Sequence, residues 1–384
     1  MESGKKLRIG VIGGVSGRGS GWVRKMVEWK ESLFPNLELV AICDKNPAVK
    51  QKAAKMQGVE AFLDYKEMYK KANLDVVIIA TPHYLHAPMA IAAAEADIHV
   101  FTEKPMCITL RQADAMARAV KMNGVMLAVG FQRRFANTHV LLKNLIDSGD
   151  LGFVYQLNLF ARSFRTNMYY DTSTLVIDPK TGREHGWKGH WNTEGGGALA
   201  NQLIHHMDIY QWIAPSPIKS VCAISRIARH TFTETDDNTN VIVEFMDGSM
   251  GNIQAGVAYE FGRDTEFGIY GTKGTVIHRG NMRDEEGKPL PIIDLRQDKS
   301  KPLKKYSPGL LMGETQMFGD FLEAIEEDDP SLISVDVDEG RKSIELLRGI
   351  FMSIILEKKV TFPLHDAEIW PSLARTYKDP TFSL

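Results

Sequence analysis

Leu7-Arg-Ile-Gly-Val-Ile-Gly-Gly-Val-Ser-Gly-Arg-Gly-Ser-Gly21 is the stretch that indicates the fold of this chain most directly. Its apolar first half predicts a buried strand, and a helical segment from Trp22 to Glu28 follows the glycines. In this context glycines let the backbone approach a phosphate group, with helix N–H groups facing the anion. The spacing is irregular, because Gly17-x-Gly19 has no third glycine at the usual place and Val15 occupies another glycine position. Alone, the loop is weak evidence for a phosphate site.

The next apolar run, Leu37-Glu-Leu-Val-Ala-Ile-Cys43, ends at Asp44. An acid at this distance past the glycines is placed to accept hydrogen bonds from the ribose diol of a dinucleotide. Its charge would repel a 2′-phosphate, so the sequence favours NAD over NADP. A helix N-cap or a turn is the alternative role for Asp44.

Further strand–helix units follow along the chain. A buried strand is predicted at Asp75-Val-Val-Ile-Ile-Ala80, a helix at 110–123 and another strand at 125–129. Repeated units of this kind predict a parallel sheet with right-handed crossovers. His83 and His86 begin an alanine-rich helix without a third ligand at metal-site spacing, which favours a cofactor-side or capping role over a metal.

Glu103-Lys104-Pro105 follows the short apolar run from Ile98 to Phe101. The carboxyl end of a parallel strand is where open α/β sheets bind their ligands. An ammonium group held there can orient or polarise a substrate oxygen, and burial can tune its pKa for acid–base work. The alternative is a surface ion pair beside a turn. The tripeptide alone does not exclude it, and the functional interpretation depends on the other motifs in the chain.

Composition limits the function classes. The chain has 384 residues and a formal net charge of −2, so one or two sizeable domains are expected, and neither nucleic acid nor a membrane is an expected partner. Cys43, Cys107 and Cys222 are far apart and lack metal-ligand spacing, as in a reduced cytoplasmic chain. The sequence predicts a soluble protein, because neither a signal peptide nor a bilayer-spanning run is visible.

A long polar and aromatic segment spans residues 163–194 without clear periodicity. Segments of this length within compact domains are usually functional or disordered. Aromatic faces stack on sugar rings, and basic groups reach hydroxyls or anionic substituents, although the aromatics could equally anchor the segment to its own domain. The segment and the residue directly before it contain Arg162, Arg165, Tyr169, Tyr170, His185, Trp187, Lys188, His190 and Trp191.

A second candidate centre begins at Gly195-Gly-Gly-Ala-Leu and continues to Trp212. Asn201, His205 and Asp208 stand at i, i+4 and i+7, so one helical face is predicted to carry all three, whereas His206 points elsewhere. A neutral histidine in a cleft suits proton transfer to or from a carbinol oxygen.

Strands are predicted beyond residue 220, with a hairpin turn at Asp247-Gly248. A surface loop is expected at 281–305, and amphipathic helices at 313–327 and 337–356. Asp236-Asp237-Asn238 could be a solvated turn or a rim of the site, and the turn is favoured.

Taken together, the chain resembles the glucose–fructose oxidoreductase / inositol dehydrogenase / MocA-like (Gfo/Idh/MocA) oxidoreductase family. The resemblance is colinear over nearly the whole chain. It rests on the glycine loop, Asp44, Ala80-Thr-Pro with His86, Glu103-Lys104-Pro105, Gly130-Phe-Gln-Arg-Arg-Phe135, Gly195-Gly-Gly-Ala-Leu with His205 and Asp208, and Phe267-Gly-Ile-Tyr-Gly-Thr-Lys-Gly274. One departure is Asn201, where many dehydrogenases of the family have Asp; an amide orients a hydroxyl but takes no proton, so base duty would fall on His205 or Lys104.

The resemblance implies an α/β protein: an N-terminal Rossmann domain, placed at 1–135, and a C-terminal α/β domain with an open, mostly antiparallel sheet at 136–384. It implies NAD, sugar or polyol substrates, homodimers or homotetramers, and C-terminal helices packing back on the first domain. The expected catalytic residues are Lys104, His205 and Asn201, without a metal. The expected cofactor residues are Gly13, Ser16, Gly17, Arg18, Asp44, Thr81, Pro82, His86, Glu103, Lys104 and Gln132, and the expected substrate residues are Arg162, Arg165, Tyr169, Trp187, Lys188, Trp191 and His206.

The leading hypothesis is an NAD-dependent oxidoreductase acting on a secondary hydroxyl of a sugar, sugar derivative or cyclitol. An NAD-dependent glycosidase or lyase that oxidises its substrate transiently is the first alternative, and a non-catalytic NAD-binding regulator is the second. Arg165 and Lys188 point towards an anionic substrate without establishing one.

Overall fold

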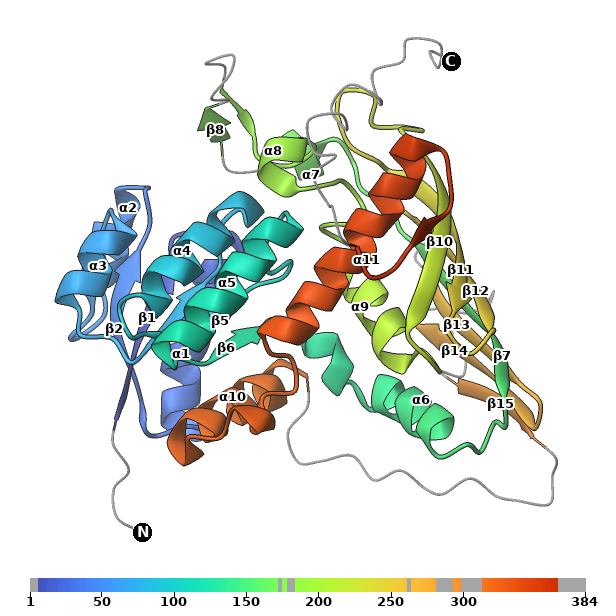
Figure 1. Ribbon diagram of the computed structural model, residues 1–384. Helices are drawn as coiled ribbons and strands as arrows, with labels where there is room; N and C mark the ends of the chain where they lie inside the picture. The colour runs from blue at the N-terminus through green and yellow to red at the C-terminus, as the bar shows by residue number, and fades with distance from the viewer. Residues whose placement is uncertain are drawn as a thin grey trace, which may run out of the picture. The chain divides into compact units, whose positions relative to one another are not determined.

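The structure is a computed structural model, and it describes residues 6–171, 175–177, 184–260, 264–280, 293–297 and 313–364. The chain forms two compact units (Figure 1). The first unit extends to Gly130 and also contains Asp320–Arg341, and the second contains Phe131–Gly319 and the chain from Lys342 onward.

The first unit is built on a parallel sheet of six strands in the order β3-β2-β1-β4-β5-β6. This is the doubly wound order, which reverses between β1 and β4 and creates a crevice at the carboxyl ends of these two strands. The strands are β1 (Leu7–Ile12), β2 (Leu37–Cys43), β3 (Glu60–Phe62), β4 (Val76–Ile79), β5 (His99–Thr102) and β6 (Leu127–Val129). The helices are α1 (Gly17–Ser32), α2 (Ala48–Ala53), α3 (Tyr65–Lys71), η1 (His83–Leu85), α4 (His86–Ala94), α5 (Leu110–Asn123), α10 (Glu314–Glu327, which enters this unit at Asp320) and η3 (Pro330–Leu332).

Local sequence signals explain where these helices begin and end. Thr109 and Gln112 form a capping box at the start of α5, and Gly124 ends the helix with φ 64°. Asp64 caps α3 by accepting hydrogen bonds from two backbone N–H groups of its first turn. The apolar run of β4 is fully buried, as expected for a central strand of a parallel sheet.

Residues 320–341, which come late in the sequence, contact β6 and α5 of the first unit. The Val129 N–H donates to the Val335 carbonyl at 2.9 Å, and Arg341 pairs with Asp114 at 2.6 Å. Gly340 is packed so closely that a Cβ there would lie 2.8 Å from Val129 and 2.9 Å from Met106. These contacts explain why residues 320–341 belong to the first unit despite their distance in sequence.

The second unit is built on an eight-stranded sheet in the order β15-β14-β13-β7-β12-β11-β10-β16. All of its pairings are antiparallel except that of β7 with β12. Its strands are β7 (Val154–Arg162), β10 (Ile218–Arg226), β11 (Asn238–Phe245), β12 (Met250–Gly256), β13 (Asp264–Gly271), β14 (Gly274–Gly280), β15 (Ile293–Gln297) and β16 (Val360–Thr361), and β8 (Leu175–Ile177) pairs separately with β9 (Glu184–Gly186). The helices are η2 (Gln132–Phe135), α6 (Asn137–Asp147), α7 (Met168–Asp171), α8 (Trp191–Glu194), α9 (Ile204–Ile213) and α11 (Val337–Leu356, which enters this unit at Lys342).

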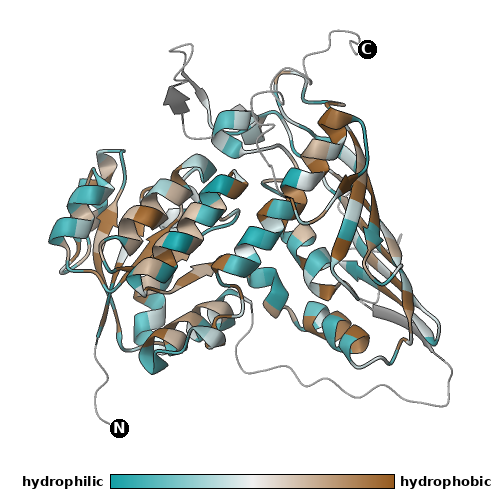
Figure 2. Cartoon of the chain, viewed as in Figure 1, coloured by the Kyte–Doolittle hydropathy of each residue, from teal (hydrophilic) through white to brown (hydrophobic). Residues whose placement is uncertain are grey.

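One face of this sheet is covered by helices, with α6, α9 and the later part of α11 lying along it in Figure 1. Inward residues such as Leu157, Leu159 and Val243 are fully buried, and the Tyr210 hydroxyl of α9 donates to the Leu157 carbonyl at 3.0 Å. Burial alternates along β11, where Ile242 faces outward. Figure 2 shows apolar residues concentrated on the strands of both units.

The α/β fold class, with a Rossmann unit and a mostly antiparallel second sheet, is confirmed. The predicted C-terminal helices are confirmed as α10 and α11. The loop predicted at 281–305 is wrong where β15 pairs with β14, and the rest of that range lies outside the described residues. In the part of the chain that the structure describes, no helix has the length and apolarity needed to cross a membrane.

Candidate active site

The glycine loop between β1 and α1 is built from close backbone contacts. Gly13 has φ +84°, and a Cβ there would lie 2.5 Å from the Ala80 carbonyl oxygen at the end of β4. A Cβ on Gly19 would lie 2.1 Å from the Gly13 carbonyl oxygen. Gly13 therefore makes the tight turn and Gly19 allows α1 to pack against it, the jobs that glycines perform in a dinucleotide fingerprint. When the motif is counted from Gly13, Gly19 takes the place of the third glycine, one residue later than the usual spacing.

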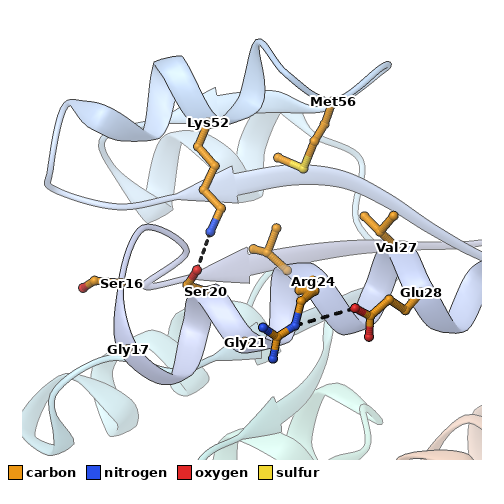
Figure 3. Close-up of a pocket in the computed structure, with 10 residues that line it drawn as sticks. Ser16, Gly17, Ser20, Gly21, Arg24, Val27, Glu28, Lys52 and Met56 are labelled. Atoms are coloured by element: carbon orange, nitrogen blue, oxygen red, sulfur yellow. Dashed lines mark hydrogen bonds and ion pairs between the residues drawn. The ribbon is translucent and has the colours of Figure 1, made fainter.

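A lysine fixes the loop from the neighbouring helix. Lys52 Nζ donates to the Gly14 carbonyl at 2.6 Å and to the Ser20 hydroxyl at 2.7 Å. Figure 3 shows Lys52 reaching towards Ser20. Both residues border a pocket of about 610 Å³, which is lined by Ser16, Gly17, Ser20, Gly21, Val23, Arg24, Val27, Glu28, Lys52 and Met56. Ser16 precedes α1 and makes no side-chain cap. The first N–H groups of α1 therefore face the loop without a capping side chain, as an anion site requires.

Asp44 connects the end of β2 to this loop. Its carboxylate accepts a hydrogen bond from the Val15 N–H at 3.0 Å and another from the Asn46 N–H at 3.0 Å. A carboxylate has about four lone-pair sites, so two remain for a ribose diol. The ribose-binding role of Asp44 stays a prediction, and its loop-fixing role is an observation.

Glu103 is a buried anchor rather than a free acid. Its Oε1 accepts from Arg18 Nε at 2.6 Å and from Trp22 Nε1 at 2.8 Å, and the residue is 5% exposed. The carboxylate therefore ties the end of β5 to α1 and orients Arg18 beside the glycine loop. Lys104 comes directly after it, half-buried, and the peptide bond to Pro105 is cis.

His86 holds two loops of the first unit together. Its Nδ1 lies 2.8 Å from the Pro105 carbonyl and its Nε2 lies 2.8 Å from the Thr81 carbonyl. Complete burial lowers its pKa, although both carbonyls act in the opposite direction. This geometry supports a positioning role for His86 between the loop at Thr81 and Pro82 and the Lys104 loop. Contact of Thr81, Pro82 and His86 with a cofactor stays a prediction.

The motif 130–135 leads from β6 into the second unit. Arg134 makes a bidentate, buried ion pair with Asp208 of α9, at 2.8 and 2.6 Å, so Asp208 is a structural partner rather than an acid–base group. The buried side-chain Oε1 of Gln132 has no hydrogen-bond partner among the described residues. An orphaned acceptor of this kind is suited to a polar ligand.

His205 and His206 point to different partners. The His205 ring lies edge-on to Phe131, 5.8 Å between centroids, and the residue is 8% exposed. His206 Nε2 lies 2.6 Å from Arg133 Nη1, and burial with this guanidinium keeps the pKa of His206 well below its ordinary value. Because His206 is occupied by Arg133, the geometry gives no support to its predicted substrate contact.

The prediction that one helical face carries Asn201, His205 and Asp208 is wrong for Asn201. The helix α9 begins at Ile204, and Asn201 lies in the preceding turn, where its N–H donates to the Gly197 carbonyl at 3.2 Å. Its side chain is buried and its Nδ2 donates to Glu194 Oε1 at 2.5 Å.

Glu194 is a buried acid bonded to Asn201 that the sequence motifs did not single out. It is 1% exposed, and its Oε2 accepts the Gly189 N–H at 2.6 Å. Burial raises the pKa of Glu194 to about 8, even though the hydrogen bonds from Asn201 and Gly189 act against this shift. Only the tertiary fold reveals this, because nothing local marks Glu194 as different from an exposed acid.

Asp236 and Asp237 are also buried, so the favoured interpretation of a solvated turn is wrong. Asp236 accepts the Gly197 N–H at 2.9 Å, and burial raises its pKa to about 6. Asp237 accepts three backbone N–H groups, between 2.7 and 2.9 Å, and contacts His230 Nδ1 at 3.0 Å. The two acids organise the backbone around the turn at 195–197 and the loop at 228–230.

The long segment brings several predicted substrate residues together. Lys188 Nζ lies 3.7 Å from the centre of the Tyr169 ring and donates to the Tyr169 carbonyl at 3.0 Å. Arg165 lies on the same ring at 5.6 Å and donates to Gln202 Oε1 at 2.5 Å. Gln202 Nε2 in turn donates to the Tyr169 hydroxyl at 2.7 Å. The result is one polar cluster of Arg165, Tyr169, Lys188 and Gln202.

Of the other predicted substrate residues, Arg162 and Trp191 make different contacts, and Trp187 borders the cluster. Arg162 alternates with the buried Ala161 on β7 and pairs with Asp264 at 2.5 Å, which places it on the outward face of the sheet. Trp191 is 1% exposed and its indole donates to the Glu234 carbonyl at 2.8 Å, as a packing residue would. Trp187 lies 5.8 Å from Lys188 Nζ.

These observations define a dinucleotide-binding α/β protein with a second, sheet-based unit. Residues 7–131 match the model of the oxidoreductase family with an NAD-binding Rossmann fold, Gfo/Idh/MocA, and residues 139–277 match the C-terminal domain of the same family. The chain belongs to the Gfo/Idh/MocA family of NAD-binding oxidoreductases. The predicted family and cofactor are confirmed.

Characterised relatives are similar over most of their length. Inositol 2-dehydrogenase of Salmonella typhimurium is 28% identical over 70% of this chain and 72% of its own. Levoglucosan dehydrogenase of Pseudarthrobacter phenanthrenivorans is 28% identical over 73% of this chain and 75% of its own. The crystal structure of the WlbA dehydrogenase from Bordetella pertussis, in complex with NADH and UDP-GlcNAcA, has a TM-score of 0.77 at 28% identity and covers 94% of this chain and 100% of that chain.

Proposed function

We propose that this protein catalyses the NAD-dependent oxidation of a secondary hydroxyl on a sugar, a sugar derivative or a cyclitol. The observation that carries the proposal is the anchored Glu103–Lys104 pair. The glycine loop and the end of β5 are joined through Arg18 and Trp22, so an ammonium group stands directly beside the anchor of a dinucleotide-binding loop.

The residues present fit NAD. A Cβ at Gly13 or Gly19 would fill the turn, the first turn of α1 presents N–H groups to a pyrophosphate, and Asp44 retains lone pairs for a ribose diol. Gly13, Ser16, Gly17 and Arg18 would form the phosphate side of the cofactor site, with Asp44 at the ribose.

The remaining residues manage the substrate hydroxyl. When bound, NAD supplies the acceptor for a hydride. The Lys104 ammonium donates a hydrogen bond to the reacting oxygen and stabilises the negative charge that develops there. His205 takes the hydroxyl proton, because Asn201 cannot. Asn201, held by Glu194, orients a hydroxyl of the substrate.

The names of the relatives support a carbohydrate or cyclitol as the substrate, since two act on inositol and levoglucosan and a third was crystallised with UDP-GlcNAcA. The polar and aromatic cluster around Tyr169 is chemically suited to such molecules, because a ring face and several donors occur side by side.

The protein is further proposed to form homodimers or homotetramers through the outward face of the second sheet. Ile224, Ile242 and Met250 project from this face and are 57–67% exposed. Neighbouring exposed apolar residues on adjacent strands are typical of a surface that another chain covers. Sedimentation analysis of the wild-type protein and of Ile242→Lys tests this proposed interface. A monomeric wild-type protein would contradict it.

The reaction is tested with purified protein and NAD across inositols, levoglucosan, neutral and acidic sugars, and aryl glycosides. Reduced nicotinamide and released aglycone are followed in the same sample. Reduced cofactor that accumulates with a free sugar or cyclitol supports a dehydrogenase. Aglycone released in large excess over reduced cofactor would instead indicate a redox-neutral glycosidase.

A further inference from the structure

Two cationic side chains of the second unit lie on one aromatic ring. The Arg165 guanidinium is 5.6 Å from the centre of Tyr169, and Lys188 Nζ is 3.7 Å from it. All three side chains are half-buried, so a small molecule can reach them while water is partly excluded. The two like charges repel each other, and partial burial strengthens the repulsion.

The charges of Arg165 and Lys188 are not neutralised within the described residues. Neither side chain has a carboxylate within 4.0 Å there, whereas other arginines of this unit do: Arg134 pairs with Asp208, Arg162 with Asp264, Arg229 with Glu260 and Arg279 with Glu266. The acceptors that Arg165 and Lys188 bond among the described residues are neutral, namely the carbonyls of Phe164 and Tyr169 and the amide oxygen of Gln202.

Glu194, the acid that acts electrostatically on Lys188, does not neutralise the positive charge of Arg165 and Lys188. Glu194 is bonded to Asn201 and to the Gly189 N–H, and because burial raises its pKa to about 8, it is largely protonated at neutral pH. Burial lowers the pKa of Lys188, and Arg165 acts in the same direction. A bound anion would relieve both effects.

Donors remain for such an anion. A guanidinium has five N–H groups and an ammonium has three, and only part of each set is engaged here. The Tyr169 hydroxyl accepts from Gln202, which leaves its own proton for another acceptor. Arginine and lysine together, above a phenol, match the oxygens of a carboxylate or a phosphate.

The backbone beneath the cluster is fixed in advance. The Arg165 carbonyl lies 2.7 Å from His230 Nε2, and His230 Nδ1 lies 3.0 Å from Asp237 Oδ2. His230 and Asp237 are both fully buried. Because these buried contacts already fix the backbone at Arg165, little conformational entropy is lost there when a ligand binds.

We propose that Arg165, Tyr169 and Lys188 form a subsite for an anionic substituent, a carboxylate or a phosphate, on the sugar or cyclitol that this enzyme oxidises. This subsite rests on the proposed function and narrows its substrates to sugar acids or phosphorylated sugars. Because Glu194 is largely protonated at neutral pH and the Gln202 amide is uncharged, neither residue neutralises the positive charge of the subsite.

The test compares three matched substrates, glucose, glucuronate and glucose 6-phosphate, at saturating NAD. We expect kcat/KM for an anionic sugar to exceed that for glucose by roughly 10- to 100-fold, the worth of one or two charge-assisted hydrogen bonds. The stronger of the two anionic substrates identifies the carboxylate or the phosphate. Arg165→Gln and Lys188→Gln are expected to remove the preference by raising KM for the anionic sugar by a larger factor than KM for glucose.

Arg229→Gln and Lys219→Gln are the matched controls, because each removes an exposed charge that is already paired with a glutamate. Arg165→Lys, which keeps the charge, is expected to restore part of the preference. Equal kcat/KM for glucose and both anions, or an equal loss for all three in Arg165→Gln, would overturn the subsite.

A binding measurement tests the subsite independently of the proposed reaction. If no sugar reduces NAD, calorimetric titration with glucuronate and glucose 6-phosphate still decides. Binding to the wild-type protein that Arg165→Gln loses upholds the subsite while the proposed reaction fails. Absence of binding by both anions overturns it.

Discussion

Asn201 donates its amide Nδ2 to Glu194 Oε1 at 2.5 Å, inside the second unit. The other oxygen of the same carboxyl accepts the Gly189 N–H, so one buried acid joins the loop after Lys188 to the amide proposed to orient the substrate. The bond also decides which end of the amide is turned towards Glu194. A residue absent from every sequence motif therefore sets the orientation of a proposed catalytic one.

Glu194→Gln tests this link through stability. The pKa of Glu194 is about 8 in the folded protein and about 4.5 in an unfolded chain. Between these values the folded state keeps a proton that the unfolded state has lost, so the stability contributed at low pH is lost as the pH rises from about 4.5 to 8, by at most about 1.4 kcal/mol per pH unit. Urea unfolding of wild type and Glu194→Gln across this range should show a steeper decline for wild type. Parallel curves would contradict the assignment.

Buried histidines predict the opposite behaviour on acidification. His139 and His278 lie with ring centroids 5.2 Å apart, and burial lowers the pKa of His278 to about 4 and lowers that of His139. Stability is full above the unfolded pKa near 6.5 and is lost as the pH falls towards 4, by about 2 kcal/mol between pH 7 and 5 for His278 alone. Denaturant unfolding at the two pH values measures it. A His278→Gln variant as acid-sensitive as wild type would count against this account.

Two glycines on one helix give a sharp test of the cofactor loop. A Cβ at Gly19 would meet the Gly13 carbonyl at 2.1 Å, whereas a Cβ at Gly21 meets nothing within 4 Å. Gly19→Ala should therefore weaken NADH binding by at least roughly 10-fold, and Gly21→Ala should bind normally and gain up to about 1 kcal/mol of stability. Fluorescence titration with NADH separates the two. Equal affinities in both variants would show that Gly19 does not shape the site.

The Glu103 anchor is tested by Glu103→Ala. The change leaves the buried Trp22 indole N–H and the Arg18 guanidinium without their acceptor, which should cost about 1–3 kcal/mol of stability and raise the Kd for NADH. Arg24→Ala on the same helix removes an exposed pair with Glu28 and is the control. A wild-type Kd in Glu103→Ala would mean that the anchor does not position the loop.

Local signals made the first unit readable from sequence. The helix at 110–123 was bounded correctly because Thr109 and Gly124 cap it, and the apolar run before Ala80 forms a central strand. The glycine assignment was incomplete because the role of Gly19 depends on its distance to Gly13 in space. Spacing alone did not show it.

The second unit was less predictable because its polar groups are satisfied by distant backbone. The burial of Asp236 depends on N–H groups of Gly197 and Leu199, and that of Glu194 depends on Gly189 and Asn201. Asn201 fits a helical spacing with His205, yet α9 begins only at Ile204. Residues 198–202, between the three glycines and α9, form a turn instead of a helix.

The most direct test of the central claim is single-turnover NAD reduction by wild type and Lys104→Ala with the best substrate of the panel. Wild type is expected to form reduced nicotinamide stoichiometrically with oxidised sugar or cyclitol. Lys104→Ala is expected to bind NADH within about threefold of wild type but to reduce NAD at least roughly 100-fold more slowly. Lys104→Ala turning over at the wild-type rate would contradict the account.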